Sequence, residues 1–286
     1  MEKIMSFFTT LSLIFTYIFG FGTITVSDGF KLEKQQKLNP IVSMTSAQGL
    51  CCDGEYFYCS GAITAIGFTG LAKYDLNMNK IKLNFNAIPK EFTKKYGSNH
   101  IGGIDCANGI IYGPAEGEID DEYKYNLIML FDAETLEFTG EYYDVSCEYL
   151  TDGIPWLAID SESGILYTSQ FNHVDKILKY DLEDMTYLGY LPLSEEINRI
   201  QGGSVFCGKL YLSYDVSHST DEQILTVDLE SGNVSSEFEI SLPNYDNEAE
   251  DICVYPLADG TLFHTLEYDK LINVNILHFS KENIDK

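Results

Sequence analysis

Gly208-Lys209-Leu210-Tyr211-Leu212-Ser213 consists of a glycine, a variable residue, an aliphatic residue, an aromatic residue, a spacer and a small hydroxyl residue. Four further segments also carry an aromatic residue three positions after a glycine, at 54–57, 109–112, 164–167 and 260–263. Asp or Asn precedes three of the five glycines, and such pairs favour hairpin turns because they accept positive φ. Aromatic residues favour pleated strands. The chain is therefore predicted to contain five copies of one β-hairpin.

The residues around each hairpin extend it to a unit of four strands. An apolar segment precedes the glycine, as at 155–160, and a third strand ends in an aromatic or apolar residue plus Asp, as at Tyr74-Asp75. A second turn and a fourth strand follow, as at 186–191. Four antiparallel strands repeated every ~45–55 residues are typical of a β-propeller blade.

The spacing of the repeats fixes the number of blades. The repeated aromatic residues lie 55, 55, 44 and 52 positions apart, which leaves no room for another blade between them. The last repeat supplies three strands, and a strand-like stretch at 30–38 precedes the first repeat. We predict an all-β, five-bladed β-propeller whose ring is closed by an N-terminal strand that completes the last blade. It forms a single domain over 28–282, with one helical turn at 91–96.

Composition limits the partners of this domain. The chain has 286 residues, of which 45% are hydrophobic, enough for a full core. Its formal net charge of −26 repels phosphate backbones and anionic membrane surfaces, so nucleic acid and membranes are disfavoured as partners. We expect a monomer whose partner is a small molecule, a peptide or a cation. High solubility is the alternative explanation of the charge.

The first 22 residues resemble a targeting segment. Lys3 precedes an apolar run over 5–21, which favours a signal peptide over 1–22, with an uncleaved signal anchor as the alternative. The protein is therefore expected to be secreted, or anchored at the cell surface.

Such a location permits disulfides, and the seven cysteines include three on adjacent strands, where a bridge would be sought first: Cys51, Cys52 and Cys59. Four cysteines precede a repeat glycine by a few positions, where buried apolar thiols account for them: Cys52, Cys106, Cys207 and Cys253.

The candidate site lies at the start of the innermost strands, because these strands converge on the propeller axis. The polar, charged or aromatic residues at these starts are Gln48, His100, Asp152, Trp156, Gln201, Glu248, Glu250 and Asp251. A histidine among carboxylates can act as an acid or a base, and several carboxylates around one channel can hold Ca²⁺. The sequence allows such a Ca²⁺ site but requires no cofactor. The alternative is that these residues tie neighbouring blades together by hydrogen bonds.

Two stretches resemble a known family. Residues 47–50, 56–61 and 71–76 resemble the opening blade of plant-type glutaminyl cyclotransferases, which are secreted five-bladed propellers that convert N-terminal glutamine to pyroglutamate. Asn247-Glu248-Ala249-Glu250 is similar to the N-E-x-E segment of that family. The resemblance implies that Glu248 or Glu250 is the acidic catalytic residue.

Three functions follow from these observations. The first is binding of a small molecule or cation at an acidic channel mouth, without catalysis. The second is a cyclotransferase-type enzyme, in which Glu248 or Glu250 handles protons while Gln48, His100 and Gln201 orient the substrate. The third is a non-catalytic scaffold for protein partners.

Overall fold

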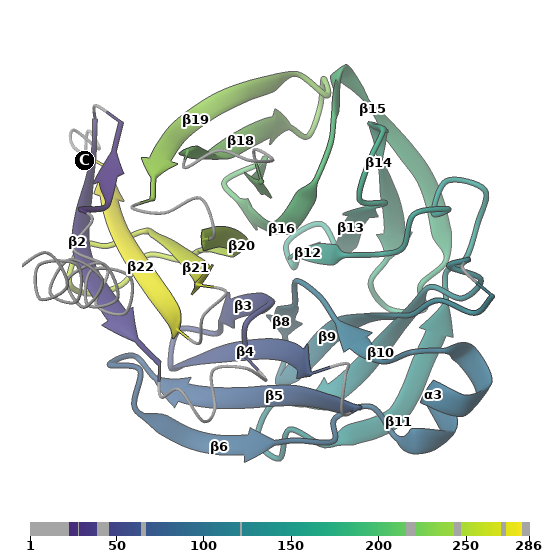
Figure 1. Ribbon diagram of the computed structural model, residues 1–286. Coiled ribbons are helices and arrows are strands. Elements are labelled where there is room, and N and C mark those ends of the chain that lie inside the picture. The colour runs from purple at the N-terminus through teal and green to yellow at the C-terminus, as the bar shows by residue number, and fades with distance from the viewer. Residues whose placement is uncertain are drawn as a thin grey trace, which may run out of the picture.

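Five antiparallel sheets surround a central axis, and strands that follow one another in the chain build most of each sheet (Figure 1). This computed structural model describes residues 23–27, 29–38, 46–63, 67–120, 122–215, 221–242, 247–269 and 273–281. The predicted signal segment at 1–22 lies outside the described residues. Among the residues that are described, no helix is both long and apolar enough to cross a membrane. The predicted five-bladed β-propeller is confirmed.

The blades follow the chain in order. The first contains β3 (Gly49–Cys52), β4 (Tyr56–Ile63), β5 (Phe68–Asp75) and β6 (Lys80–Asn84). The second contains β7 (His100–Ile101), β8 (Asp105–Ala107), β9 (Ile110–Glu116), β10 (Leu127–Asp132) and β11 (Phe138–Asp144). The third contains β12 (Trp156–Asp160), β13 (Ile165–Ser169), β14 (Val174–Asp181) and β15 (Tyr187–Ile197).

The last two blades include strands from the start of the chain. The fourth contains β16 (Ile200–Phe206), β17 (Lys209–Tyr214), β18 (Asp221–Asp228) and β19 (Val234–Ser241), with β1 (Thr25–Val26) added outside β19. The fifth contains β20 (Asn247–Val254), β21 (Phe263–Asp269) and β22 (Asn273–Lys281), with β2 (Phe30–Lys37) as its outer strand, antiparallel to β22. The N-terminal strands therefore connect two neighbouring blades, which the sequence did not indicate for β1.

The repeated glycine forms the turn between the first and second strands of a blade. Asn108 and Gly109 have φ of 52° and 77°, and Cys207 and Gly208 have φ of 49° and 74°. Two successive positive φ angles match the right-handed twist of the flanking strands, and glycine adopts them without a steric penalty. The aromatic residue three positions later then lies in the second strand of the blade, as predicted.

The aspartate that ends the third strand shapes the next turn. Asp228 Oδ1 accepts hydrogen bonds from the backbone N–H groups of Glu230 and Ser231, at 3.2 and 2.8 Å. Asp132 accepts the equivalent bonds from the two residues at the same positions of its own turn. The carboxylate accepts backbone N–H groups for which the turn offers no carbonyl acceptor. This explains why Asp recurs at this position.

The core lies between blades rather than within them. Each pair of adjacent blades encloses its own group of buried side chains; Trp156 and Leu212, for example, pack between the third and fourth blades. A blade is apolar on both faces, so it buries both only when it has a neighbour on each side. The single described helix, α3 (Lys90–Tyr96), covers the predicted helical turn and packs Phe92 against Phe138 of β11, with ring centroids 5.2 Å apart.

Candidate functional site at the propeller axis

Hydrogen bonds tie each inner strand to the next one around the axis. Asp251 Oδ2 accepts the N–H of Leu50 at 2.7 Å, and Asp251 Oδ1 accepts the N–H of Ile252 at 2.8 Å. Ser204 Oγ accepts the N–H of Val254 at 3.0 Å. Asp251 is completely buried, and Gly202 lies against it with no room for a side chain. The carboxyl group of Asp251 therefore joins the first, fourth and fifth blades at the axis.

Trp156, which the sequence suggested as a ligand-binding residue, lies inside the core. Its side chain is fully buried, and Nε1 donates a hydrogen bond to Ser169 Oγ at 3.1 Å. The indole ring packs directly over Gly203 of the neighbouring inner strand. A ligand in the channel cannot touch the indole in this arrangement, so the position of Trp156 is explained by packing.

A polar chain crosses the starts of the first three blades. Gln48 Oε1 and His100 Nε2 are 2.7 Å apart, and His100 Nδ1 lies 3.5 Å from Glu116 Oε1. Glu116 Oε2 in turn accepts the N–H of Ile154 at 2.5 Å. The structure thus brings together the predicted residues Gln48 and His100, and adds Glu116 from the end of β9. Asp152 is held separately, by two hydrogen bonds from Asn172.

Acidic side chains gather at the starts of the fourth and fifth blades. Glu250 is buried, and its pKa is raised well above the ordinary range, first by burial and then by the negative charges of neighbouring acids. These neighbours are Glu248, Asp215, Asp251 and Glu222. Arg199 forms an ion pair with Asp215, and Gln201 lies half-buried at the start of β16. This group, here called the acidic mouth, places the buried carboxyl group of Glu250 beside other carboxyl groups.

A cavity of about 290 Å³ opens at the other end of the inner strands, where they run into the hairpin turns. All five blades contribute to its lining, and Cys52, Asp105, Cys106 and Cys253 are among the lining residues. Burial raises the pKa of Asp105 to about 7. The three cysteines occupy equivalent positions in the sequence repeat, where only buried core thiols were expected. Their arrangement around one cavity follows from the rotational repeat of the blades.

The cysteines differ from expectation in two respects. All seven are free thiols, so no disulfide joins Cys51, Cys52 or Cys59. Cys207 is exposed instead of buried, because it occupies the left-handed position of its hairpin turn and lies outside β16.

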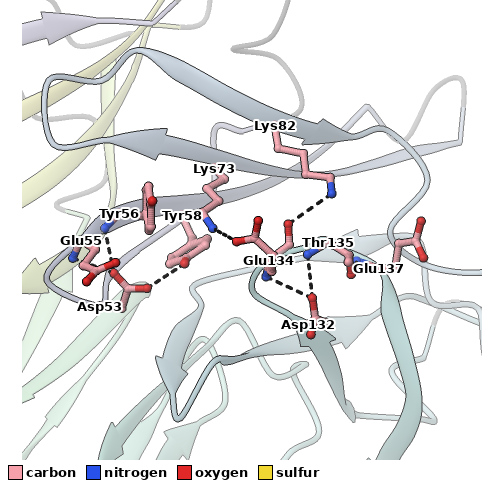
Figure 2. Close-up of polar contacts among 10 residues, drawn as sticks. All are labelled: Asp53, Glu55, Tyr56, Tyr58, Lys73, Lys82, Asp132, Glu134, Thr135 and Glu137. Carbon is pink, nitrogen blue, oxygen red and sulfur yellow. Dashed lines mark hydrogen bonds and ion pairs between the residues drawn. The ribbon is translucent and has the colours of Figure 1, made fainter.

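An ion pair also joins the first two blades (Figure 2). The ammonium group of Lys73 lies 2.6 Å from Glu134 Oε2 and 4.0 Å from the centre of the Tyr56 ring. Lys73 has 5% of its side chain exposed and Glu134 has 84%, so the pair sits at the edge of the interface. Its role is to hold neighbouring blades together, because each partner comes from a different blade.

Comparisons with known proteins agree on the fold and give no family. No protein-family model matches the chain, and no curated protein matches it. The solved structure of RS223-Beta-xylosidase is similar over 87% of this chain and 95% of its own, with 10% identity and a TM-score of 0.60. The GH43_1 enzyme from Xanthomonas citri complexed with xylose is similar over 85% and 89%, with 12% identity and a TM-score of 0.57. A chain of the Mitotic Checkpoint Complex matches over 82% of this chain and 63% of its own, with a TM-score of 0.41. The five sheets around the axis define the class, a five-bladed β-propeller.

Proposed function

We propose that this propeller binds a positively charged ligand, either a cation such as Ca²⁺ or an amine of a small molecule or peptide, at the acidic mouth. The observation that carries the proposal is the buried carboxyl group of Glu250, which is surrounded by further acids. Burial and like charges both oppose its ionisation, and a bound positive charge removes both costs at once. The net charge of −26 also draws cations toward the protein.

The pH dependence of stability tests this arrangement. The pKa of Glu250 is higher in the folded protein than its ordinary value of 4.5, so the folded state binds the proton more tightly than the unfolded state does. The stability that this group contributes is therefore present below pH 4.5 and is lost as the pH rises from there. We expect Glu250→Gln to remove this loss and to raise the free energy of unfolding at neutral pH by about 1–3 kcal/mol.

The control for that experiment is Glu162→Gln, which removes the same charge from an exposed turn. Melting temperatures of the parent and both variants are compared from acidic to neutral pH, with Ca²⁺, with a polyamine or with a chelator. We expect ligand to raise the melting temperature of the parent and of Glu162→Gln but not that of Glu250→Gln. Equal shifts in all three proteins, or no shift in the parent, would contradict the proposal.

An enzymatic role is the second candidate, and the same carboxyl groups favour it. Glu250, whose pKa is raised, and the neighbouring Glu248 form a pair of carboxyl groups of the kind that glycoside hydrolysis and related group transfers use as acid and base. The two similar xylose-related propellers suggest aryl xylosides as substrates, and the N-E-x-E resemblance suggests N-terminal glutaminyl peptides. Release of the aryl group, or of ammonia from the peptide, is the measurement. We expect Glu250→Gln to lower either activity at least 100-fold, and an unchanged rate would exclude Glu250 as the acid.

A further inference from the structure

Two thiols and one carboxyl group meet where the first and second blades touch at the axis. Cys51 comes from β3, and Asp105 and Cys106 come from β8. The ligand atoms of these three side chains all lie within 4.8 Å of one another. Cys51 is only 2% exposed, whereas Asp105 and Cys106 line the axial cavity. The cluster is therefore enclosed by protein and is also reached from the cavity.

Hydrogen bonds from backbone N–H groups hold the carboxyl group of Asp105 in place. Asp105 Oδ1 accepts the N–H of Cys106 at 2.7 Å, and Asp105 Oδ2 accepts the N–H of Ile159 at 2.8 Å. Cys51 is paired across the sheet with Tyr58, whose hydroxyl donates to Asp53 Oδ2 at 2.7 Å (Figure 2). Partners that fix ligand orientation are typical of built metal sites, because they remove the cost of ordering the ligands.

The donor set selects the type of cation. Thiolates bind thiophilic ions, whereas Ca²⁺ and Mg²⁺ take oxygen ligands. Two thiolates on a tetrahedral Zn²⁺ lie roughly 3.8 Å apart, given a bond length of about 2.3 Å. The observed spread of the three donor atoms needs only a small closing movement to reach that geometry. We propose that Cys51, Asp105 and Cys106 form a binding site for a thiophilic divalent cation of the Zn²⁺ class.

A fourth ligand would come from the cavity, which Asp105 and Cys106 line. Cys52 and Cys253 line the same cavity, and either thiol or a water molecule can complete the shell. This site differs from the acidic mouth in chemistry, since its donors are mainly sulfur, and it shares no residue with that group. A negative result for the proposed function therefore leaves the proposed metal site untouched, and the reverse is also true.

Cobalt titration tests the site directly, because thiolate-bound Co²⁺ gives a charge-transfer absorption that oxygen-bound Co²⁺ lacks. The folded protein is kept reduced with a phosphine and titrated with Co²⁺ alone. We expect this absorption to saturate at one equivalent and to disappear when Zn²⁺ is added. We expect Cys51→Ser and Cys106→Ser to weaken binding at least tenfold and to lower the absorption per bound ion.

Two variants serve as controls. Cys207→Ser removes an exposed thiol from the equivalent hairpin of the fourth blade, and Glu162→Gln removes an acidic group from an exposed turn. Both are expected to keep the affinity and the spectrum of the parent. Thermal melting without metal checks the fold of each variant. If Cys51→Ser does not fold, Asp105→Asn replaces it, because the amide oxygen still accepts a backbone N–H, and the same tenfold weakening is expected.

Three results would overturn the site. The first is the absence of thiolate absorption in the reduced parent. The second is parent-like affinity in folded Cys51→Ser, Cys106→Ser and Asp105→Asn. The third is a Cys51–Cys106 disulfide, found by peptide mapping of the folded protein, that reduction does not convert into a Co²⁺-binding form.

Discussion

Gly202→Ala is expected to lower the free energy of unfolding by about 4 kcal/mol, because overpacking and a broken buried hydrogen-bond network act together. A Cβ atom at Gly202 would lie 1.8 Å from Asp251 Oδ1 and 2.6 Å from Asp251 Cα. Asp251 cannot move aside, because its carboxyl group is bound to the N–H groups of Leu50 and Ile252. The alanine must therefore separate two inner strands at the axis.

Gly109→Ala is the matched control for this substitution. Gly109 has φ of 77°, and no atom lies within 4 Å of where its Cβ would be, so alanine there meets only backbone strain of about 1 kcal/mol. The two variants are compared by urea unfolding, which is monitored by circular dichroism and by the fluorescence of the single tryptophan. Equal losses at Gly202 and Gly109 would show that the close packing of Asp251 on Gly202 is not what stabilises the ring.

Trp156→Ala is expected to destabilise the protein by about 3–5 kcal/mol, since truncation of a buried aromatic residue leaves a cavity. The indole of Trp156 is fully buried between the third and fourth blades, and Ser169 would also lose its hydrogen bond from Nε1. Trp156→Phe retains most of the packing, so we expect it to lose less than half as much.

Tyr190→Ala provides the comparison for that series, because the Tyr190 side chain is 46% exposed on the outer strand of the third blade. We expect this truncation to cost less than about 1 kcal/mol. Melting followed by circular dichroism is the measurement for all three variants. A ligand-dependent shift that disappears in a folded Trp156→Phe variant, with stability unchanged, would mean that Trp156 contacts ligand rather than core.

The fold could be predicted from local patterns because a propeller repeats them. The turn at Asn108-Gly109 requires positive φ, and the turn after Asp228 requires the carboxylate of that residue. Both requirements involve residues only a few positions apart, so both can be recognised in the sequence. No comparable local pattern identifies the short strand β1. Its two residues pair with β19, more than 200 positions away in the chain.

The candidate site was predictable only in part. Converging inner strands correctly place Gln48 beside His100, since both begin an innermost strand. Whether a polar residue at such a start bonds to the next blade depends on side-chain direction. Asp251 accepts the N–H of Leu50 in the first blade, whereas the adjacent Glu250 is buried among other acids. Trp156 illustrates the same limit, because only the glycine opposite it gives the indole a place inside the core.

The sequence by itself determined the five-fold repeat, the order of strands in each blade and the acidic character of the protein, because turn geometry, strand alternation and charge are local properties. Only the tertiary structure decided which residues meet. Closing the ring brings Asp251 against Gly202 and Cys51 against Cys106, from blades that no local pattern relates. These contacts depend on how far each side chain lies from the axis, and that distance is set only when the blades assemble.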